Sequence, residues 1–462
     1  MTLIKSISGF RGTIGGKTGD NLTPIDVVKF ASAYAWWVKT ELNGTTIILG
    51  RDARVSGPII SDLVSSTILA MGLNIIDLGL STTPTVEMAV MLEKADGGII
   101  LTASHNPKQW NALKLLNNKG EFISATEAEK VLAIVEEEPF VFAEINALGK
   151  YSKNNQYLEK HIDEILKLPL VDVAAIKEKN YKIAVDAVNS SGGIAVPMLL
   201  RKLGVDNIVE INCEPTGLFA HNPEPLPEHL SQLSTLVKTE KCHLGISVDP
   251  DVDRLAFVCE DGEMFGEEYT LVAVADYVLR NTTNGNTVSN LSSTRALKDI
   301  TEKLGGQYKA SAVGEVNVVT VMKETNAVIG GEGNGGIIYP ELHYGRDALV
   351  GIALFLTHLA KLSKTCKALK ISYPSYIISK NKVELSDSIN ADDVLEKIKE
   401  KYSKFPINTE DGVKIDFDEE WIHMRKSNTE PIIRIYAESK SETTARNLTT
   451  KIIKDIGEIA KS

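Results

Sequence analysis

Several features are scarce or missing in this 462-residue sequence, and each absence narrows the class of protein. Basic residues are outnumbered, since 50 Lys and Arg face 61 Asp and Glu; the formal charge of −11 argues against a general nucleic-acid binder. No stretch approaches the roughly 20 apolar residues that span a bilayer, so we expect no membrane partner. The N-terminus lacks the apolar core of a secretion signal, and we therefore expect a cytoplasmic protein.

Cysteines are also few, and they are widely spaced. They form no C-x-x-C pair and no zinc-finger spacing, so the sequence indicates neither a disulfide framework nor a structural zinc site. We expect reduced, mostly buried thiols at Cys213, Cys242, Cys259 and Cys366.

What the sequence does contain is the composition of an ordinary globular protein, long enough for three or four domains. Short apolar runs alternate with helical segments of 10 to 15 residues, which indicates α/β units with mostly parallel sheets. This rhythm restarts near residues 181 and 287, and after about residue 368 alternating strands precede a long amphipathic helix. We therefore predict three mixed α/β domains followed by a small α+β domain, at 1–150, 151–256, 257–368 and 369–462.

The first polar motif is TASHNP at 102–107, which follows the apolar run GGIIL. A turn after a parallel strand places Ser104 at the carboxyl edge of the sheet, where ligands bind in such folds. Its hydroxyl could act as a nucleophile or carry a phosphate. A plain polar turn accounts for the same residues, and His105 is equally ambiguous.

The second motif is DPDVDR at 249–254, with carboxylates at Asp249, Asp251 and Asp253. Three carboxylates at this spacing repel one another unless a cation is present, and Mg²⁺ prefers oxygen ligands. An EF-hand needs Gly at its sixth position, where Arg254 stands, so we exclude a calcium hand. A solvated charge run is the weaker alternative.

The third motif is GEGNGG at 331–336, which satisfies G-x-G-x-x-G after a strand. A dinucleotide site needs a helix next, but Pro340 follows, and no acidic residue lies near position 356. What remains is either a glycine-rich turn or a loop that presents Glu332 and Asn334 to vicinal hydroxyls.

The fourth motif is RKSNTEP at 425–431, with Arg434 three residues beyond it. Hydroxyls, an amide and two arginines suit a phosphate, because a guanidinium can bind phosphate oxygens bidentately. An ordinary turn between strands is the alternative. Arg11 on a glycine-flanked loop and Lys114, ten residues after Ser104, complete the set.

Together, and in this order, the four motifs closely resemble those of the α-D-phosphohexomutases, a family of phosphoglucomutases, phosphomannomutases and phosphoglucosamine mutases. The resemblance covers essentially the whole chain. It implies four domains around a central cleft, closed over the substrate by the C-terminal domain. It also implies a phosphoserine, one Mg²⁺ per chain, a small phosphosugar substrate and a hexose 1,6-bisphosphate activator.

By motif match, Ser104 is the expected phosphoserine, and its phosphate joins Asp249, Asp251 and Asp253 as a metal ligand. Arg11, Lys114 and Arg254 match positions around the reacting phosphate, with Lys114 a candidate for proton transfer. The expected substrate-binding residues are Glu332 and Asn334 in the sugar loop, and Arg425, Ser427, Asn428, Thr429 and Arg434 at the distal phosphate.

Two departures from the family pattern affect the expected function. Many members carry Ser where Asn334 stands and His where Gly336 stands, so no histidine base is expected there; His343 is a candidate substitute. The sugar loop and Val313-Gly314-Glu315 resemble the archaeal-type and phosphoglucosamine mutase branches. We therefore expect interconversion of glucosamine 6-phosphate and glucosamine 1-phosphate by a monomer or homodimer, with a broad phosphogluco/phosphomannomutase as the alternative.

Overall fold

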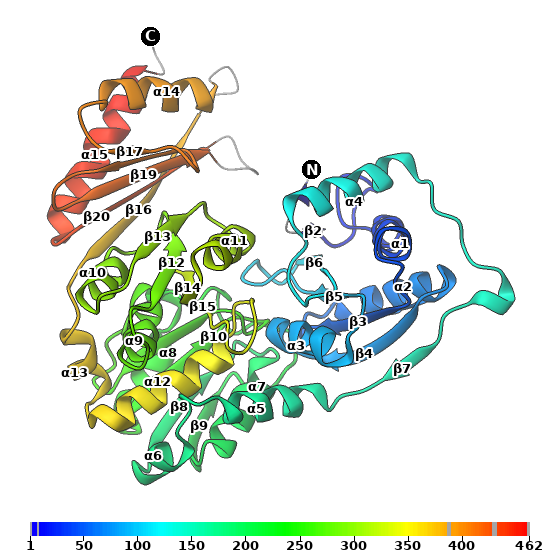
Figure 1. Cartoon of the computed structure of the whole chain (residues 1–462), viewed down its shortest axis with the longest axis horizontal. Coiled ribbons are helices and arrows are strands. Elements are labelled where there is room, and N and C mark those ends of the chain that lie inside the picture. The colour runs from blue at the N-terminus through cyan, green and yellow to red at the C-terminus, as the bar shows by residue number, and fades with distance from the viewer. Residues whose placement is uncertain (1, 7–8, 386–389, 427–431, 460–462) are drawn as a thin grey trace.

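The computed structural model describes residues 2–6, 9–385, 390–426 and 432–459, which form four sheets with helices packed against them (Figure 1). Among these residues, none of the helices combines the length and the apolar character needed to cross a bilayer. All four cysteines are free; three are buried and Cys213 is partly exposed, as the sequence predicted.

The first sheet has seven strands in the spatial order β1-β2-β6-β5-β3-β4-β7. Its parallel half holds β5, β3, β4 and β7, and the rest is antiparallel. The bounds are β1 Ile4–Ser6, β2 Gly9–Thr13, β3 Thr46–Arg51, β4 Asn74–Leu80, β5 Gly97–Leu101, β6 Trp110–Leu116 and β7 Tyr151–Lys153. The helices of this part are α1 Pro24–Glu41, α2 Gly57–Ala70, α3 Thr83–Glu93 and α4 Ala125–Glu137, with a short 3-10 turn at Ile145–Ala147.

The second and third sheets have four strands each, in the orders β11-β10-β8-β9 and β13-β12-β14-β15. Their strands are β8 Lys182–Asp186, β9 Asn207–Ile211, β10 Leu244–Val248, β11 Leu255–Cys259, β12 Asn286–Asn290, β13 Tyr308–Ser311, β14 Ala327–Glu332 and β15 Gly336–Ile338. Their helices are α5 Tyr157–Lys167, α6 Val173–Glu178, α7 Gly192–Lys202, α8 Ser231–Thr239, α9 Glu267–Arg280, α10 Ala296–Lys303, α11 Glu315–Thr325, α12 Ala348–Leu362 and α13 Cys366–Ile371, with a 3-10 turn at Pro227–His229.

One strand plan recurs in all three sheets. In each of the runs β3–β6, β8–β11 and β12–β15, the first two strands pair in parallel, the third pairs in parallel with the first, and the fourth returns antiparallel to the third. The loops between the third and fourth strands are the TASHNP, DPDVDR and GEGNGG segments. Each motif therefore leaves the carboxyl end of a central strand, which is where α/β sheets bind ligands.

The C-terminal part is an antiparallel sheet in the order β16-β20-β19-β18-β17, with two helices packed against it. Its elements are β16 Ile377–Glu384, α14 Ala391–Lys401, β17 Ile407–Asn408, β18 Val413–Asp416, β19 Trp421–Lys426, β20 Ile432–Ser439 and α15 Glu442–Ile459. In Figure 1 this orange and red part sits beside the third sheet. Lys414 donates to the carbonyl of Leu291 at 2.9 Å, and Glu438 accepts from the N–H of Arg295 at 3.1 Å, so hydrogen bonds join the two parts.

The expected domain boundaries differ from the observed elements by a few residues. β7 pairs in parallel with β4, so the first sheet extends to residue 153 instead of ending at 150. The 256/257 boundary falls inside β11, and the 368/369 boundary falls inside α13. Residues 151–153, which we placed in the second domain, therefore belong to the edge of the first sheet.

Candidate active site

Ser104 and Asp249 bring the first and second units together. The Ser104 hydroxyl donates to Oδ2 of Asp249 at 2.7 Å, and both side chains are buried. We name the segment 102–107 the serine loop and 249–254 the aspartate loop. Two residues 145 positions apart in sequence therefore meet at the carboxyl edges of β5 and β10.

The serine loop is held in an unusual conformation by a buried arginine. Ser104 has φ +46°, a left-handed backbone that non-glycine residues adopt only with support. The Arg54 guanidinium donates to the carbonyls of Ser104, Asn106, Pro107 and Trp110 at 2.5 to 2.9 Å. Asp52 pairs with Arg54 Nε at 3.0 Å and accepts from the hydroxyl of Thr102 at 2.6 Å.

The sequence interpretation did not include Asp52 and Arg54. Their signal was the charged segment R-D-A-R at 51–54, which follows the apolar run TIILG at the carboxyl edge of a predicted strand. Both side chains have no exposed surface, and buried charges need a partner. They support the serine loop and do not face an open space.

The aspartate loop concentrates three buried carboxylates. One oxygen from each of Asp249, Asp251 and Asp253 lies within 4.8 Å of the other two. Burial and the charges of Asp251 and Asp253 raise the pKa of Asp249 well above its usual range. Val252, between them, has φ +63°, an uncommon backbone for a β-branched residue. The loop therefore crowds negative charge at a cost in free energy.

A magnesium ion fits this cluster. Oδ1 of Asp251 and Oδ1 of Asp253 are buried and have no hydrogen-bond partner. An orphaned buried carboxylate oxygen is costly, whereas a hard divalent cation takes such oxygens as ligands. The donor set is all oxygen, which suits Mg²⁺ and not a soft metal.

Lys114 faces the same cluster from β6. Its Nζ lies 2.8 Å from Oδ2 of Asp251 and 3.6 Å from Oδ2 of Asp253. Burial acts to lower the pKa of Lys114, but these two carboxylates outweigh burial and raise it above its usual value. Lys114 is therefore a stable cation at neutral pH. Thr83, at the start of α3, also donates to Asp251, at 2.6 Å.

The segment 331–336, which we name the glycine loop, contributes Glu332 from the third unit. Oε1 of Glu332 accepts from Asn290 at 2.8 Å and from the N–H of Gly314 at 3.0 Å. Burial acts to raise the pKa of Glu332, but the neighbouring Arg346 lowers it below its usual range. Asn334 turns its amide oxygen back to the N–H of Gly336, at 3.1 Å. Glu332 is thus held as a carboxylate.

Arg346 connects the glycine loop to the aspartate loop, and the sequence interpretation missed it. Its guanidinium contacts Glu332 at 2.6 Å, Asp253 at 2.7 Å and Glu315 at 3.0 Å. It lies in the turn between β15 and α12, ten residues beyond the motif. No motif surrounds it, and its only signal is the pattern G-R-D before an apolar helix.

The two histidines named from the sequence lie in different surroundings. Nδ1 of His105 is 3.4 Å from the Ser104 hydroxyl, and the nearby Arg254 together with burial lowers the pKa of His105. His343 is buried, with Nδ1 3.4 Å from Glu87 and Nε2 3.4 Å from Asp347. Both ring nitrogens of His343 therefore lie near internal carboxylates.

Arg254 lies at the end of the aspartate loop. Its N–H donates to Oδ1 of Asp249 at 3.1 Å, and its guanidinium contacts Glu224 at 3.1 Å. Nε of Arg254 is buried without a hydrogen-bond partner. The side chain thus keeps donor capacity next to the serine and aspartate loops.

Arg425 and Arg434 lie on the C-terminal sheet, directly opposite each other in β19 and β20. Burial and the charge of Arg434 lower the pKa of Arg11 below its usual value. Nε of Arg11 and Nε of Arg425 are buried without a hydrogen-bond partner. The remaining expected residues of this site lie outside the described residues: Ser427, Asn428 and Thr429.

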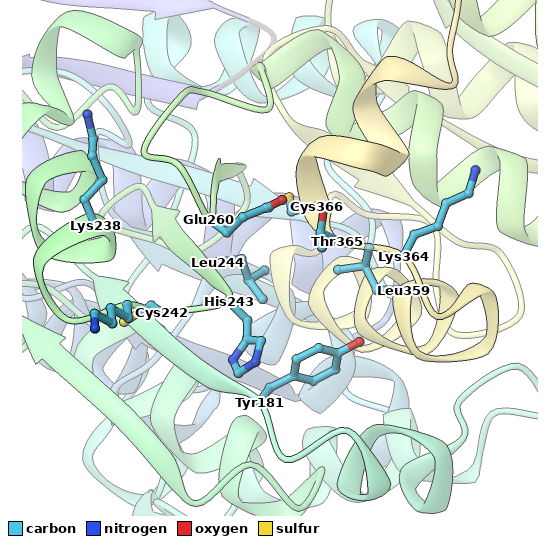
Figure 2. Close-up of a pocket in the computed structure, with 11 residues that line it drawn as sticks. Tyr181, Lys238, Cys242, His243, Leu244, Glu260, Leu359, Lys364, Thr365 and Cys366 are labelled. Atoms are coloured by element: carbon cyan, nitrogen blue, oxygen red, sulfur yellow. The ribbon is translucent and has the colours of Figure 1, made fainter.

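A cavity of about 360 Å³ lies elsewhere, between the start of β10 and the start of α13 (Figure 2). Tyr181, His243 and Cys366 are among the residues that line it. The ammonium groups of Lys238 and Lys364 point away from its centre in Figure 2. The lining residues belong to none of the loops above, and polar groups do not converge there, so we assign it no ligand.

Four family models match the chain in succession. They are the phosphoglucomutase/phosphomannomutase alpha/beta/alpha domains I, II and III at residues 3–142, 159–262 and 266–376, and the C-terminal domain at 381–454. Among solved structures, a phosphoglucomutase/phosphomannomutase family protein from Burkholderia thailandensis has a similar fold. Its TM-score is 0.86 at 23% identity, over 99% of this chain and 97% of that one.

Curated relatives extend over nearly the full length. The phosphoglucomutase/phosphomannomutase of Thermococcus kodakarensis is 35% identical over 97% of this chain and 99% of its own. The phosphoglucosamine/phosphogalactosamine mutase of Sulfurisphaera tokodaii is 33% identical over 96% of this chain and 98% of its own. The chain therefore belongs to the α-D-phosphohexomutase family, which includes the phosphoglucomutases and phosphomannomutases.

Proposed function

We propose that the chain is a magnesium-dependent phosphoglucosamine mutase that interconverts glucosamine 6-phosphate and glucosamine 1-phosphate. The observation that carries this proposal is the contact between the Ser104 hydroxyl and Asp249, 2.7 Å apart, beside two orphaned carboxylate oxygens. A serine fixed beside a buried magnesium-type site is suited to hold a phosphoryl group. Relatives of the same length are named for mutase activities on hexose or hexosamine phosphates.

In this proposal, Ser104 carries a phosphate and gives it to the substrate. The bond between Ser104 Oγ and phosphorus breaks while a bond forms between phosphorus and the free hydroxyl oxygen of the sugar monophosphate. Oγ then takes a proton, for which the charged Lys114 is the proposed source. The proton released by the sugar hydroxyl replaces the one that Lys114 gives up, so the products are a hexose 1,6-bisphosphate and a neutral Ser104 hydroxyl. This bisphosphate turns over and returns its other phosphate to Ser104.

Electrostatic stabilisation is the main requirement of phosphoryl transfer, because charge spreads over the equatorial oxygens of the transferred group. A bound Mg²⁺ offsets this charge. We assign Asp249, Asp251 and Asp253 to its binding, and Arg254 and Arg11 to the phosphoryl oxygens. Glu332 and Asn334 are proposed to hold sugar hydroxyls. Arg425 and Arg434, with Ser427, Asn428 and Thr429 outside the described residues, are proposed to hold the phosphate that does not react.

A dedicated preference for glucosamine is the finer part of the proposal. The test compares kcat/KM for the 1- and 6-phosphates of glucosamine, glucose and mannose. Glucosamine phosphates are expected to be converted most efficiently. Equal efficiency on all three sugars contradicts the dedicated assignment and supports the broad phosphogluco/phosphomannomutase, which the name of the relative from Thermococcus kodakarensis favours.

Hydrolysis of the phosphosugar is the competing reaction, because water could replace the sugar hydroxyl as acceptor. Assays that quantify isomer and inorganic phosphate in the same sample separate the two reactions. A mutase gives isomer far in excess of phosphate. Release of phosphate at or above the rate of isomer formation contradicts the proposal.

A further inference from the structure

Arg346 occupies the space that a side chain at position 336 would need. A Cβ built on Gly336 lies 2.3 Å from Cδ of Arg346 and 3.1 Å from its Cγ, and real Cβ atoms essentially never come within 3.0 Å of another heavy atom. The backbone of Gly336 does not have a positive φ, unlike that of Gly335, so conformation does not demand glycine there. Glycine is therefore needed at position 336 because the Arg346 side chain leaves no room for a Cβ atom there.

The backbone of Arg346 is fixed, so the side chain cannot easily move aside. Arg346 forms an antiparallel bridge with Ile338, and its N–H donates to Oε1 of Glu315 at 3.2 Å. The next residue, Asp347, caps α12 by accepting from the N–H of Leu349 at 2.8 Å. The helix start and the strand β15 thus set the direction in which Arg346 enters the site.

The guanidinium of Arg346 reaches three separate segments. Nη2 donates to Asp253 in the aspartate loop, and Nη1 donates to Glu332 in the glycine loop. Nε lies 3.0 Å from Glu315 at the start of α11, as an ion pair without the geometry of a hydrogen bond. The arginine side chain is only 11% exposed, and its three partners are 7% exposed or less. A planar fork of donors can join carboxylates in fixed directions, which a lysine ammonium cannot do.

We infer that Arg346 is a positioning residue that couples the metal-binding carboxylates to the sugar-binding carboxylate, and that Gly336 is its matched partner. This inference rests on the proposed function. Arg346 holds Glu332 as a hydroxyl acceptor and directs Asp253 toward the cluster of three aspartates. A side chain at 336 and the observed course of the Arg346 side chain exclude each other.

The first test separates charge from geometry. Arg346→Lys keeps a positive charge but loses the fork, so the protein is expected to fold while kcat/KM falls on the order of tenfold to a hundredfold. The KM for phosphosugar and the Mg²⁺ concentration for half-saturation are both expected to rise. Isothermal titration calorimetry of Mg²⁺ with the unphosphorylated protein gives a readout independent of turnover. Arg280→Lys, which changes a distant arginine paired with Asp276, is the matched control.

The second test is a double-mutant cycle. Gly336→Ala places a methyl group against Cδ of Arg346 and is expected to lower the unfolding temperature and kcat/KM. In the Arg346→Ala background, Cδ is absent, so the same glycine substitution is expected to change the unfolding temperature little. Arg346→Gln keeps Cδ without the guanidinium, so there Gly336→Ala is expected to remain harmful. These comparisons keep the pairing testable even if one variant is weakly active.

Two results overturn the inference. One is an Arg346→Lys protein with wild-type KM and Mg²⁺ affinity, because the carboxylates would then be positioned without the planar guanidinium donors. The other is an additive cycle, in which Gly336→Ala costs the same with and without the arginine side chain. Absence of mutase activity in the wild-type protein contradicts the proposed function instead. The calorimetric and unfolding measurements still report on Arg346 in that case.

Discussion

Arg425 in β19 lies directly opposite Arg434 in β20, and on the other side of Arg434 lies Lys382 in β16. Residues directly opposite in neighbouring strands share a face of the sheet, where like charges repel and destabilise the pairing. Three cations in a row across three strands therefore repel one another, and Asp411 and Glu384 lie 3.9 Å from Arg425 and 3.6 Å from Lys382.

Replacement of Arg434 tests this arrangement. Arg434→Ala is expected to raise KM for the phosphosugar at least tenfold, because the phosphate that does not react loses a bidentate donor. Without ligand, the unfolding temperature is expected to stay equal or rise, since a like-charge contact is removed. The stabilisation by added phosphosugar is expected to shrink. A fall in the unfolding temperature without ligand, with an unchanged ligand shift, contradicts an anion site here.

Arg54 is expected to be important for folding more than for chemistry. Arg54→Met leaves Asp52 buried without its cation and frees four carbonyls of the serine loop, at a cost of about 3–5 kcal/mol in the free energy of unfolding. The double variant Asp52→Asn with Arg54→Met removes both charges and is expected to recover part of that loss. Urea denaturation measures both. Equal stability of the single variant and the wild-type protein excludes this role.

Lys414 gives the contact between the third unit and the C-terminal sheet a pH dependence. Burial lowers the pKa of Lys414 to about 8, whereas an unfolded lysine titrates near 10.4. Between these values the unfolded chain binds the extra proton, so the folded state gains stability as the pH rises from about 8 to above 10. At pH 7 Lys414 is protonated in both the folded and the unfolded chain, so the folded chain buries a charge and this gain in stability is absent.

The comparison with Lys414→Met isolates this effect. The stability of the wild-type protein relative to the variant is expected to increase by on the order of 1–3 kcal/mol between pH 8 and pH 10. Unfolding temperatures of the two proteins across this range provide the measurement. A constant difference across the range shows that Lys414 does not titrate abnormally.

Much of the site was predictable because its residues cluster in short motifs. Asp249 and Asp253 follow one strand, Ser104 follows another, and both strands were recognisable as apolar runs; the structure brings these loops together. The strand order that aligns three such loops could not be read from composition, because the three units share a plan but not a detectable sequence repeat. Only the pairing of strands in the structure shows this shared order.

Other residues escaped prediction for a physical reason. Arg54 donates to Ser104, which is 50 residues away in sequence, and Arg346 donates to Asp253, which is 93 residues away. Neither arginine lies in a polar motif. A lone arginine in a sequence is most often a surface residue. Only burial and the carbonyls or carboxylates around it reveal its role. The glycine at 336 was visible as a departure from the family pattern, but only the structure shows that the side chain of Arg346 lies against it.

The most direct test of the central claim follows the phosphate on Ser104. The protein is labelled with ³²P-phosphate at Ser104 through a labelled hexose bisphosphate, freed of ligand, and mixed with unlabelled glucosamine 6-phosphate and Mg²⁺. The account predicts that the label passes to the hexose phosphates within one turnover and that Ser104→Ala acquires no label. Label that stays on the protein, or that leaves only as inorganic phosphate, would contradict a phosphoserine mutase.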